Sequence, residues 1–172
     1  MYRRRSSLIV TTSRRPSKRT RSLSRELALL LGATRITRGK KSLSALHAEA
    51  LRLGAKAVII IANVKGNPGV LRIYNVSENS LAEKATFRIE GVSLAREARR
   101  EVPPGAKRLS MESDGSPIAR EVVASLQSSL PPSDRGESLV LRVEGREERA
   151  VVTFLFRERV VGPTLKLKPL KK

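Results

Sequence analysis

Basic side chains dominate the first forty-one residues of this sequence, where Glu26 is the only acidic residue. The segment carries +12 of the chain's net charge of +19. Clustered guanidinium and ammonium groups neutralise phosphates, so an excess of this size is typical of a surface that binds a polyanion, although a solvated charged face is the simpler alternative. The basic residues are Arg3, Arg4, Arg5, Arg14, Arg15, Lys18, Arg19, Arg21, Arg25, Arg35, Arg38, Lys40 and Lys41.

Three of these side chains fall on one face of a predicted helix. Between residues 16 and 31 the leucines recur at helical spacing, and Lys18, Arg21 and Arg25 lie on the opposite side. Pro16 suits the first helical position, and Gly32 suits the stop because glycine adopts the left-handed geometry that ends many helices. One face of this helix should therefore pack while the other stays positive.

Other candidates for phosphate binding are expected near this helix. Two arginines precede it, and a basic turn follows the next predicted strand. The helix N-terminus adds backbone donors and a favourable dipole, and serine hydroxyls can donate to phosphate oxygens. The candidates are Ser13, Arg14, Arg15, Ser17, Lys18, Arg21, Arg25, Arg38, Lys40 and Lys41.

An enzyme is difficult to build from this composition. There is no cysteine, and the single histidine, His47, lies among the apolar positions of a second predicted helix at 42–54, where we interpret it as partly packed. Asp114 and Asp134 fall in predicted loops, and most glutamates lie beside arginines as solvated ion pairs. We predict a protein that is not an enzyme and has no metal, cofactor or small-molecule substrate.

The segment Gly66-Asn67-Pro68-Gly69 is interpreted as a turn. It lacks the spacing and the Lys-Ser/Thr end of a P-loop, and it joins two predicted strands at 57–64 and 70–76. Pro-Gly favours a type II turn, so a hairpin is expected here. Lys65, next to it, is a candidate for a peripheral phosphate contact.

The few aromatic residues indicate the kind of nucleic acid. They are Tyr2, Tyr74, Phe87, Phe154 and Phe156. The last two alternate with Leu155 in a strand that we expect to be buried, so a platform for stacked bases is not expected. Recognition of structured or duplex RNA by shape and phosphates fits better.

Alternating strands and helices predict an α/β (α+β) sheet protein. The strand at 57–64 is apolar throughout, which favours a central position covered on both faces. Further strands are expected at 8–12, 33–37, 86–94, 139–143, 150–156 and 165–167, and a third helix at 116–130. The stretch from 103 to 115 begins with Pro103-Pro104-Gly105 and should be the least ordered internal region.

Three segments in this order resemble the Brix domain of ribosome-biogenesis proteins in its short archaeal form. They are residues 9–22 (IVTTSRRPSKRTRS), residues 35–43 (RITRGKKSL) and the turn at 66–69. The resemblance is clear over residues 7–77. Beyond them it rests on length and strand pattern.

This resemblance implies an Imp-type, non-enzymatic protein that binds rRNA or pre-rRNA and assists rRNA processing and small-subunit assembly in pre-ribosomal particles. It also implies two similar α/β halves, each like the anticodon-binding domain of class II aminoacyl-tRNA synthetases. Leu23 stands where many members have phenylalanine, which changes the core and not the RNA-binding interpretation. The family's basic motif maps onto Ser13, Arg14, Arg15, Ser17, Lys18, Arg19 and Arg21.

The expected organisation is a flexible basic N-terminus at 1–6, one domain at 7–168 with halves of about 7–82 and 83–168, and a basic tail at 169–172. We expect none of the long terminal extensions of eukaryotic members. The longest apolar run, 57–62, is far shorter than the roughly 20 residues of a membrane span, and the lack of cysteine fits a reducing compartment, so a cytoplasmic location without membrane contact is expected. An integral ribosomal protein and a general nucleic-acid-binding (chromatin) protein are the alternatives.

Overall fold

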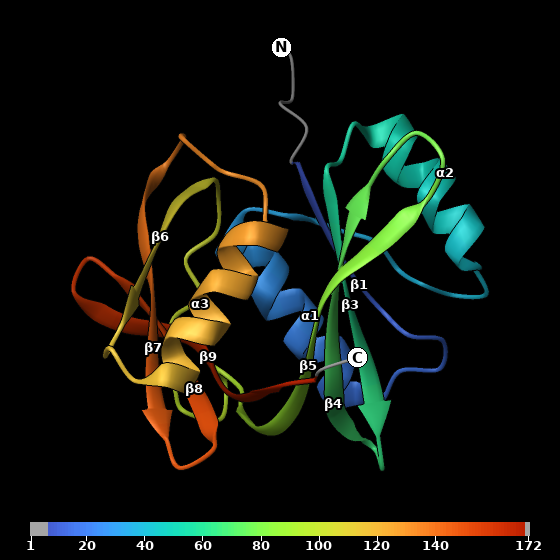
Figure 1. Cartoon of the computed structure of the whole chain (residues 1–172). Coiled ribbons are helices and arrows are strands. Elements are labelled where there is room, and N and C mark those ends of the chain that lie inside the picture. The colour runs from blue at the N-terminus through green and yellow to red at the C-terminus, as the bar shows by residue number, and fades with distance from the viewer. Residues whose placement is uncertain (1–6, 171–172) are drawn as a thin grey trace.

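One mixed sheet extends across the computed structural model, which describes residues 7–170 (Figure 1). Within these residues the strands are β1 (Leu8–Thr12), β2 (Thr34–Arg35), β3 (Ala57–Val64), β4 (Asn67–Val76), β5 (Leu81–Ser93), β6 (Lys107–Ser113), β7 (Glu137–Arg146), β8 (Arg149–Phe156) and β9 (Arg159–Pro169). The helices are α1 (Lys18–Leu31), α2 (Leu43–Leu53) and α3 (Pro117–Ser129). The strand order is β2-β1-β3-β4-β5-β9-β8-β7-β6, which confirms the expected α+β class.

The first five strands combine a parallel group with an antiparallel meander. β1 pairs in parallel with β2 on one side and β3 on the other, and β3, β4 and β5 then pair antiparallel. Because α1 and α2 each follow a parallel strand, both helices begin at the carboxyl end of this group. That edge of the sheet therefore collects the segments that precede α1 and α2, together with the end of β3.

The last four strands share part of this order of connections, without counterparts of β2 and α2. β6 pairs in parallel with β7 by way of α3, and β7, β8 and β9 pair antiparallel. Antiparallel pairing of β5 with β9 joins the two parts into one sheet. The boundary near residue 82 and the likeness of each half to a synthetase domain stay predictions.

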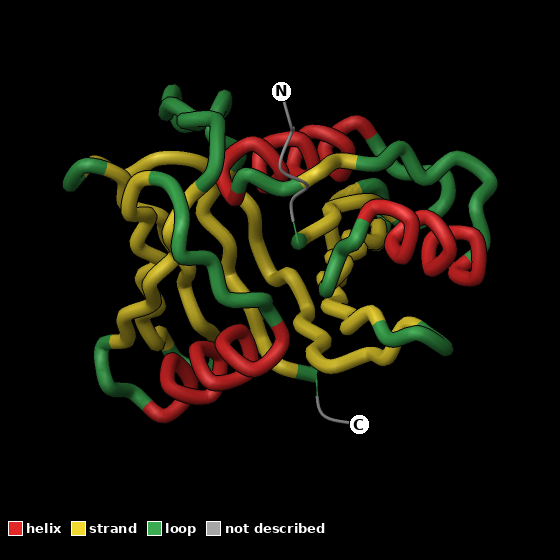
Figure 2. Tube along the Cα trace, turned by 90° about the horizontal axis from the view of Figure 1, so that it is seen from above, coloured by secondary structure: helices red, strands yellow, loops and turns green. Residues whose placement is uncertain are grey.

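The helices pack on the sheet through apolar faces. α1 and α3 share one hydrophobic cluster, to which α1 contributes Leu23, Leu27 and Leu30. Each buried leucine stabilises the fold by about 1.5–3 kcal/mol. α2 packs on the opposite face of the sheet through Leu46 and Ala50, and Figure 2 shows it standing apart from the other two helices. β3 is therefore covered on both faces, as its sequence predicted.

Serine caps set the starts of the helices. The Ser17 hydroxyl accepts from the backbone N–H of Thr20, so α1 begins after Ser17 and Pro16 lies outside the helix, not at its first position. Gly32 ends α1 at a φ of 63°, as expected. Ser42 and Ser116 cap α2 and α3 in the same way.

The hairpin between β3 and β4 is tighter than expected. Its turn residues are Lys65 and Gly66, with φ of 50° and 79°, whereas Asn67 and Pro68 already belong to β4. Positive φ at both turn residues matches the right-handed twist of the flanking strands, so this geometry replaces the expected type II turn.

Three other segments differ from the sequence-based expectations. Residues 107–113, within the stretch expected to be least ordered, form β6 and pair along their length with β7. β9 is longer than the short strand expected at 165–167. Pro169 ends β9, and the Leu170 N–H donates to the Thr86 carbonyl at 2.9 Å, so the sheet includes the first part of the expected tail. The remainder of the tail and residues 1–6 lie outside the described residues.

Candidate nucleic-acid interface

The loop at residues 13–17, which we call the basic loop, has a fixed main chain. The Ser13 N–H donates to the Ile61 carbonyl at 2.9 Å. Asn63, near the end of β3, accepts from the Ser17 N–H at 3.1 Å and donates to the Arg15 carbonyl at 2.8 Å. Asn63 also accepts from the hydroxyl of Thr20 in α1. One neutral side chain therefore joins the basic loop, the helix and the sheet.

The exposed basic residues of this region lie on the basic loop and on α1. We call this set the basic face: Arg14, Arg15, Lys18, Arg21 and Arg25. None of the five forms an ion pair with a described residue, and the one hydrogen bond from their side chains is that of Arg14 Nε to the Lys41 carbonyl at 3.4 Å. Lys18, Arg21 and Arg25 are therefore exposed on one side of α1, as the helical spacing predicted, and their charges are not neutralised within the described residues.

Arg38 differs from this set because it is buried, with 8% of its surface exposed. Its Nε donates to the Lys41 carbonyl at 2.7 Å, and one terminal nitrogen donates to the Thr12 carbonyl at 3.1 Å. Burial lowers the pKa of Arg38, and nearby Arg14 lowers it further, but a guanidinium stays charged. The structure thus places Arg38 inside the protein, where it joins the end of β1 to the loop before α2 and is not exposed as the sequence-based interpretation expected.

Arg19 is also engaged within the protein. One terminal nitrogen lies 2.6 Å from a Glu97 carboxylate oxygen and 3.1 Å from the Val92 carbonyl, and the other donates to Asn67 at 3.0 Å. The hydrogen bond from Arg19 is the main cause that lowers the pKa of the Glu97 carboxyl. Arg19 therefore connects α1 to the hairpin and to the segment after β5.

The remaining predicted phosphate contacts differ in their exposure and in their hydrogen bonds within the protein. Lys40 and Lys65 are exposed, and Lys41 is half-buried with its Nζ 3.1 Å from the Thr37 carbonyl. The Ser17 hydroxyl also donates to the hydroxyl of Thr20, so its hydrogen is used within the helix cap, while Ser13 is half-buried. Lys40 and Lys65 therefore add free charge at the border of the basic face, whereas Lys41 and Ser17 are engaged within the protein.

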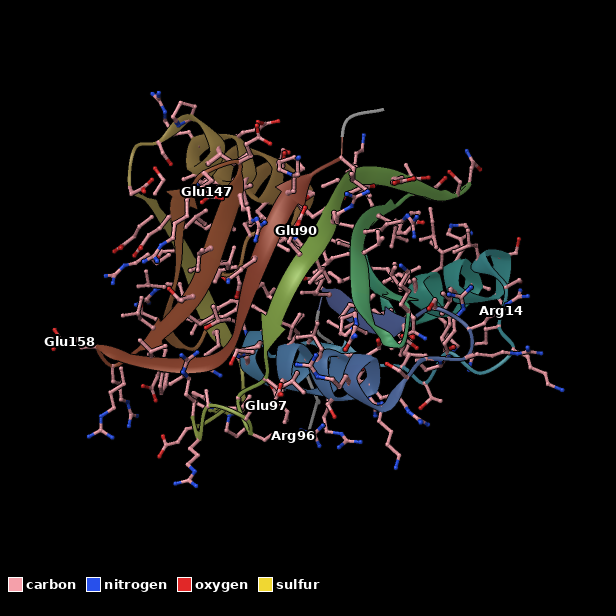
Figure 3. The ribbon with its side chains drawn as sticks, turned by 90° about the horizontal axis from the view of Figure 1, so that it is seen from below. Arg14, Glu90, Arg96, Glu97, Glu147 and Glu158 are labelled. Carbon is pink, nitrogen blue, oxygen red and sulfur yellow. The ribbon has the colours of Figure 1, made fainter. Side chains whose placement is uncertain are left out.

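Sequence reasoning missed three arginines that lie beside α1. Arg35 on β2 is exposed, with its Nε 3.4 Å from the Ser24 hydroxyl of α1. Arg96 and Arg99 are exposed on the segment after β5, and Figure 3 shows Arg96 and Glu97 next to α1. Some seventy residues separate them from α1 in the chain, and only the cluster Ala95-Arg96-Glu97-Ala98-Arg99-Arg100 signalled them. No pattern signalled the role of Asn63.

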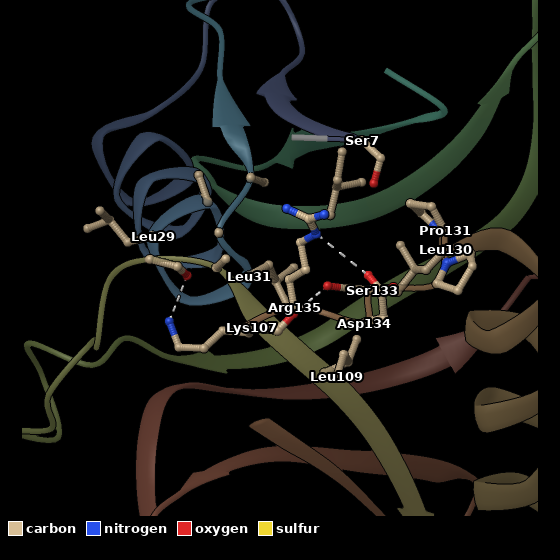
Figure 4. Close-up of a pocket in the computed structure, with 17 residues that line it drawn as sticks. Ser7, Leu29, Leu31, Lys107, Leu109, Leu130, Pro131, Ser133, Asp134 and Arg135 are labelled. Carbon is tan, nitrogen blue, oxygen red and sulfur yellow. Dashed lines mark hydrogen bonds and ion pairs between the residues drawn. The ribbon is translucent and has the colours of Figure 1, made fainter. Parts of the chain in front are cut away.

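A separate groove of about 910 Å³ lies at the other end of the parallel strands (Figure 4). Its apolar lining includes Leu31, Leu109 and Leu130. The Nζ of buried Lys107 donates to the Pro103 and Gly105 carbonyls at 2.7 and 2.9 Å, and burial lowers its pKa. The groove offers shape and apolar surface, and its charged lining residues, Lys107, Asp134 and Arg135, are of both signs, so it does not extend the basic face.

No group of three or more His, Asp or Glu side chains in residues 7–170 could hold a metal ion. His47 is half-buried, with its Nε2 2.7 Å from the Ser77 carbonyl. Over the same residues, no helix is both long and apolar enough to cross a membrane.

Several proteins resemble this chain in sequence, although no family model matches it. A "Probable Brix domain-containing ribosomal biogenesis protein" of Aeropyrum pernix is 35% identical over 167 residues, which cover 92% of this chain and 93% of that protein. A protein of the same name from Pyrococcus abyssi is 29% identical over 185 residues, with 94% and 83% coverage.

Two solved structures resemble the chain in fold. The crystal structure of a probable ribosomal biogenesis protein from Aeropyrum pernix K1 matches with a TM-score of 0.86 and 34% identity, covering 95% of this chain and 97% of that chain. Mil, described as an archaeal Imp4-like protein, matches with a TM-score of 0.66 and 24% identity, covering 93% and 96%. The second match supports the fold alone.

Proposed function

This chain belongs to the Brix domain family of ribosomal biogenesis proteins, and from that premise we propose that it binds ribosomal RNA or its precursor through the basic face during subunit assembly. The names of its relatives support a role in ribosome biogenesis and indicate no enzymatic family. A cytoplasmic location fits this role. Assistance in small-subunit rRNA processing is the specific step that we propose.

The absence of neutralising carboxylates around the basic face supports RNA binding most strongly. Some other exposed arginines of the described residues have acidic partners, as Arg157 has Glu137 at 2.7 Å and Arg142 has Glu112 at 3.3 Å, whereas the five cations of the basic face lie together and none of them has one. The fold therefore holds unpaired cations close together although they repel one another. Each phosphate that it neutralises releases condensed counterions, so binding should be strong and dependent on salt.

Two kinds of residue cooperate in this proposal. The basic face makes the phosphate contacts, and the N-terminus of α1 adds its positive dipole end. Arg38, Arg19 and Asn63 position the basic loop and the start of α1 and do not bind RNA themselves. Lys40, Lys41 and Lys65 make peripheral contacts.

Burial of the aromatic residues favours structured or duplex RNA as the ligand. Phe87 and Phe154 are buried. Phe156 is half-buried and has Lys107 and Arg157 over its ring, with distances of 5.5 and 5.1 Å to the centroid. Tyr2 lies outside the described residues. Base stacking on aromatic side chains, the usual mode for single strands, therefore has little support.

A filter-binding titration against structured rRNA fragments at several salt concentrations tests the proposal. The variant R14E/R15E/K18E/R21E should lose at least about a hundredfold in affinity, because it removes four phosphate contacts and adds four repulsive charges. The control R108E/R120E/R159E/K166E makes the same charge change at exposed residues of the second half, none of which forms an ion pair with a described residue. Circular dichroism checks that both variants fold.

Two results would contradict the proposed site. One is normal RNA binding by the basic-face variant; the other is an equal loss of RNA affinity in the control, which would indicate attraction by overall charge alone.

Sedimentation of cell extracts separates an assembly factor from an integral ribosomal protein. We expect association with immature particles and absence from mature subunits.

A further inference from the structure

The segment between the two halves contains a short helical turn at residues 94–100. The N–H groups of Glu97 and Ala98 donate to the Leu94 carbonyl at 3.0 and 3.1 Å, and the Arg100 N–H donates to the Ala95 carbonyl at 2.9 Å. Arg99 ends the turn in the left-handed conformation, with a φ of 54°. This is the ending that helices usually make with glycine.

Two glutamates fasten this turn to α1. The buried Glu26 carboxylate accepts from the Ala95 N–H at 2.8 Å. Glu97 accepts from the Leu94 N–H at 3.0 Å and pairs with Arg19 at 2.6 Å. Arg19 and Glu26 are two helical turns apart, so the segment runs along one flank of α1. On its other side, Arg100 donates to the Thr164 hydroxyl at 2.6 Å and ties the turn to β9.

This arrangement presents Arg96 and Arg99 to solvent beside the basic face. Both are exposed, and neither forms an ion pair within the described residues, although Arg96 is close enough to Glu97 to contribute to the lowered pKa of that carboxyl. Arg35 lies on the opposite flank of α1, next to Ser24. The basic face is thus bordered by arginines on both sides.

The conformation of Arg99 is costly for a residue with a side chain. A left-handed φ disfavours every residue except glycine, and such strain concentrates at functional sites. Within residues 7–170 the Arg99 guanidinium makes no hydrogen bond or ion pair, so glycine would serve the turn better. Arg15 and Lys65, at φ of 55° and 50°, are two further exposed basic residues in this conformation around the same surface, and Glu147, Arg157 and Glu158 adopt it in the hairpin turns of the second half.

We propose that Arg96 and Arg99 form a second row of phosphate contacts, which binds the same RNA along the flank of α1. This inference rests on the proposed function and extends its site across the connection between the halves. The Glu26 and Glu97 carboxylates position the row and keep it rigid. The ligand class is the phosphate backbone of structured RNA, and no base is recognised by this row.

The variants R99G and R96A/R99G test this proposal, with R108A/R120A as the control for loss of two positive charges. R99G should raise the midpoint of thermal unfolding by about 2–4 °C, because glycine relieves the left-handed strain. It should also lower the slope of log K against log salt by about 1. R96A/R99G should lower the slope by about 2 and weaken RNA binding roughly tenfold at 0.15 M salt. The control should keep the wild-type slope.

The outcomes separate this inference from the proposed function. If R96A/R99G is folded and binds RNA with wild-type affinity and slope, while the basic-face variant has lost binding, the second row is wrong and the basic face stands. Should the wild-type protein show no salt-dependent RNA binding, both proposals fail. A gain in stability in R99G without loss of affinity would mark Arg99 as a merely solvated residue.

Discussion

Two loops occupy equivalent places in this fold, each between the first strand of a parallel pair and the helix that follows it. The basic loop lies between β1 and α1, and the segment Asp114–Ser116 lies between β6 and α3. In the first, Asn63 of the neighbouring strand fastens the main chain. In the second, the Asp114 carboxylate accepts from the N–H groups of Ser116 and Gly145, both at 3.0 Å. One anchor is neutral and the other is an anion.

This difference in anchor matches a difference in charge between the halves. Residues 7–82 contain fourteen basic and three acidic side chains, whereas residues 83–168 contain sixteen and thirteen. An anionic anchor fits a half whose charges largely cancel, and a neutral one fits a loop surrounded by cations. The same topology thus supplies two rigid loops, of which we propose that only one binds RNA. The fold sets where such a site can be, and side-chain chemistry decides whether it forms.

The largest effect should come from the two buried cations that fasten loops in the two halves. Arg38→Met and Lys107→Met each remove a charged donor from two backbone carbonyls, which should lower the free energy of unfolding by about 1–3 kcal/mol in urea titrations. Arg38→Met should also weaken RNA binding several-fold, because the basic loop and its neighbour lose their connection. Lys107→Met should leave RNA affinity unchanged. An equal loss of RNA affinity in both variants would contradict the proposed difference between the two halves.

A smaller effect is expected at the loop anchors themselves. Asn63→Leu removes the acceptor for the Ser17 N–H and should lower the free energy of unfolding by about 1–2 kcal/mol, with a several-fold loss of RNA affinity. Asp114→Ala removes the corresponding acceptor of the second half and should destabilise its loop without changing RNA affinity. Thermal unfolding and filter binding measure the two effects. RNA affinity that fell in Asp114→Ala and not in Asn63→Leu would reverse the assignment of the halves.

The smallest effect concerns acid. Hydrogen bonds from Ser116 are the main cause that holds the pKa of Asp114 below its usual range. A lowered carboxyl pKa stabilises the native loop above the unfolded value of about 3.9, and that contribution is lost as the pH falls through the folded value. Below about pH 4 the amide signals of Ser116 and Gly145 should therefore shift in NMR spectra while that of Ser17 persists, because Asn63 does not titrate.

The variant D114N is the control for this acid effect. Asparagine keeps an acceptor oxygen but does not titrate, so the selective shift of Ser116 and Gly145 should disappear. Simultaneous loss of the Ser17 signal in the wild-type protein would show that the two anchors do not differ in this way.

Much of the fold could be predicted where the sequence is strongly periodic or capped. The continuous apolar run of β3 and the leucine spacing of α1 indicated their types, and Ser42 and Gly54 marked both ends of α2. β6 was missed because Arg108, Ser110 and Glu112 alternate with weakly apolar residues and its parallel pairing with β7 depends on distant sequence. The turn prediction was wrong because Pro68 lies within the start of β4, opposite Asn63, and not in the turn.

For the candidate site, sequence supplied the charged residues but not their partners. Helical spacing placed Lys18, Arg21 and Arg25 on one exposed face, because spacing alone determines the sides of a helix. Helical spacing could not distinguish Arg38 from its exposed neighbours. Arg38 is buried because its guanidinium donates to the carbonyl of Thr12, which belongs to β1 and lies far from Arg38 in the chain. The connection of Arg96 and Arg99 to α1 depends on two contacts between residues far apart in the chain, Glu26 with Ala95 and Arg19 with Glu97.

Backbone NMR of the isotope-labelled protein, titrated with a structured rRNA fragment, tests the central claim most directly. We predict that amide shifts change at residues 13–25, with smaller changes at 38–41 and 94–100, and that the amides of Asp114–Ser116 stay unchanged. Changes concentrated in residues 107–168 would contradict the assignment of RNA binding to the first half.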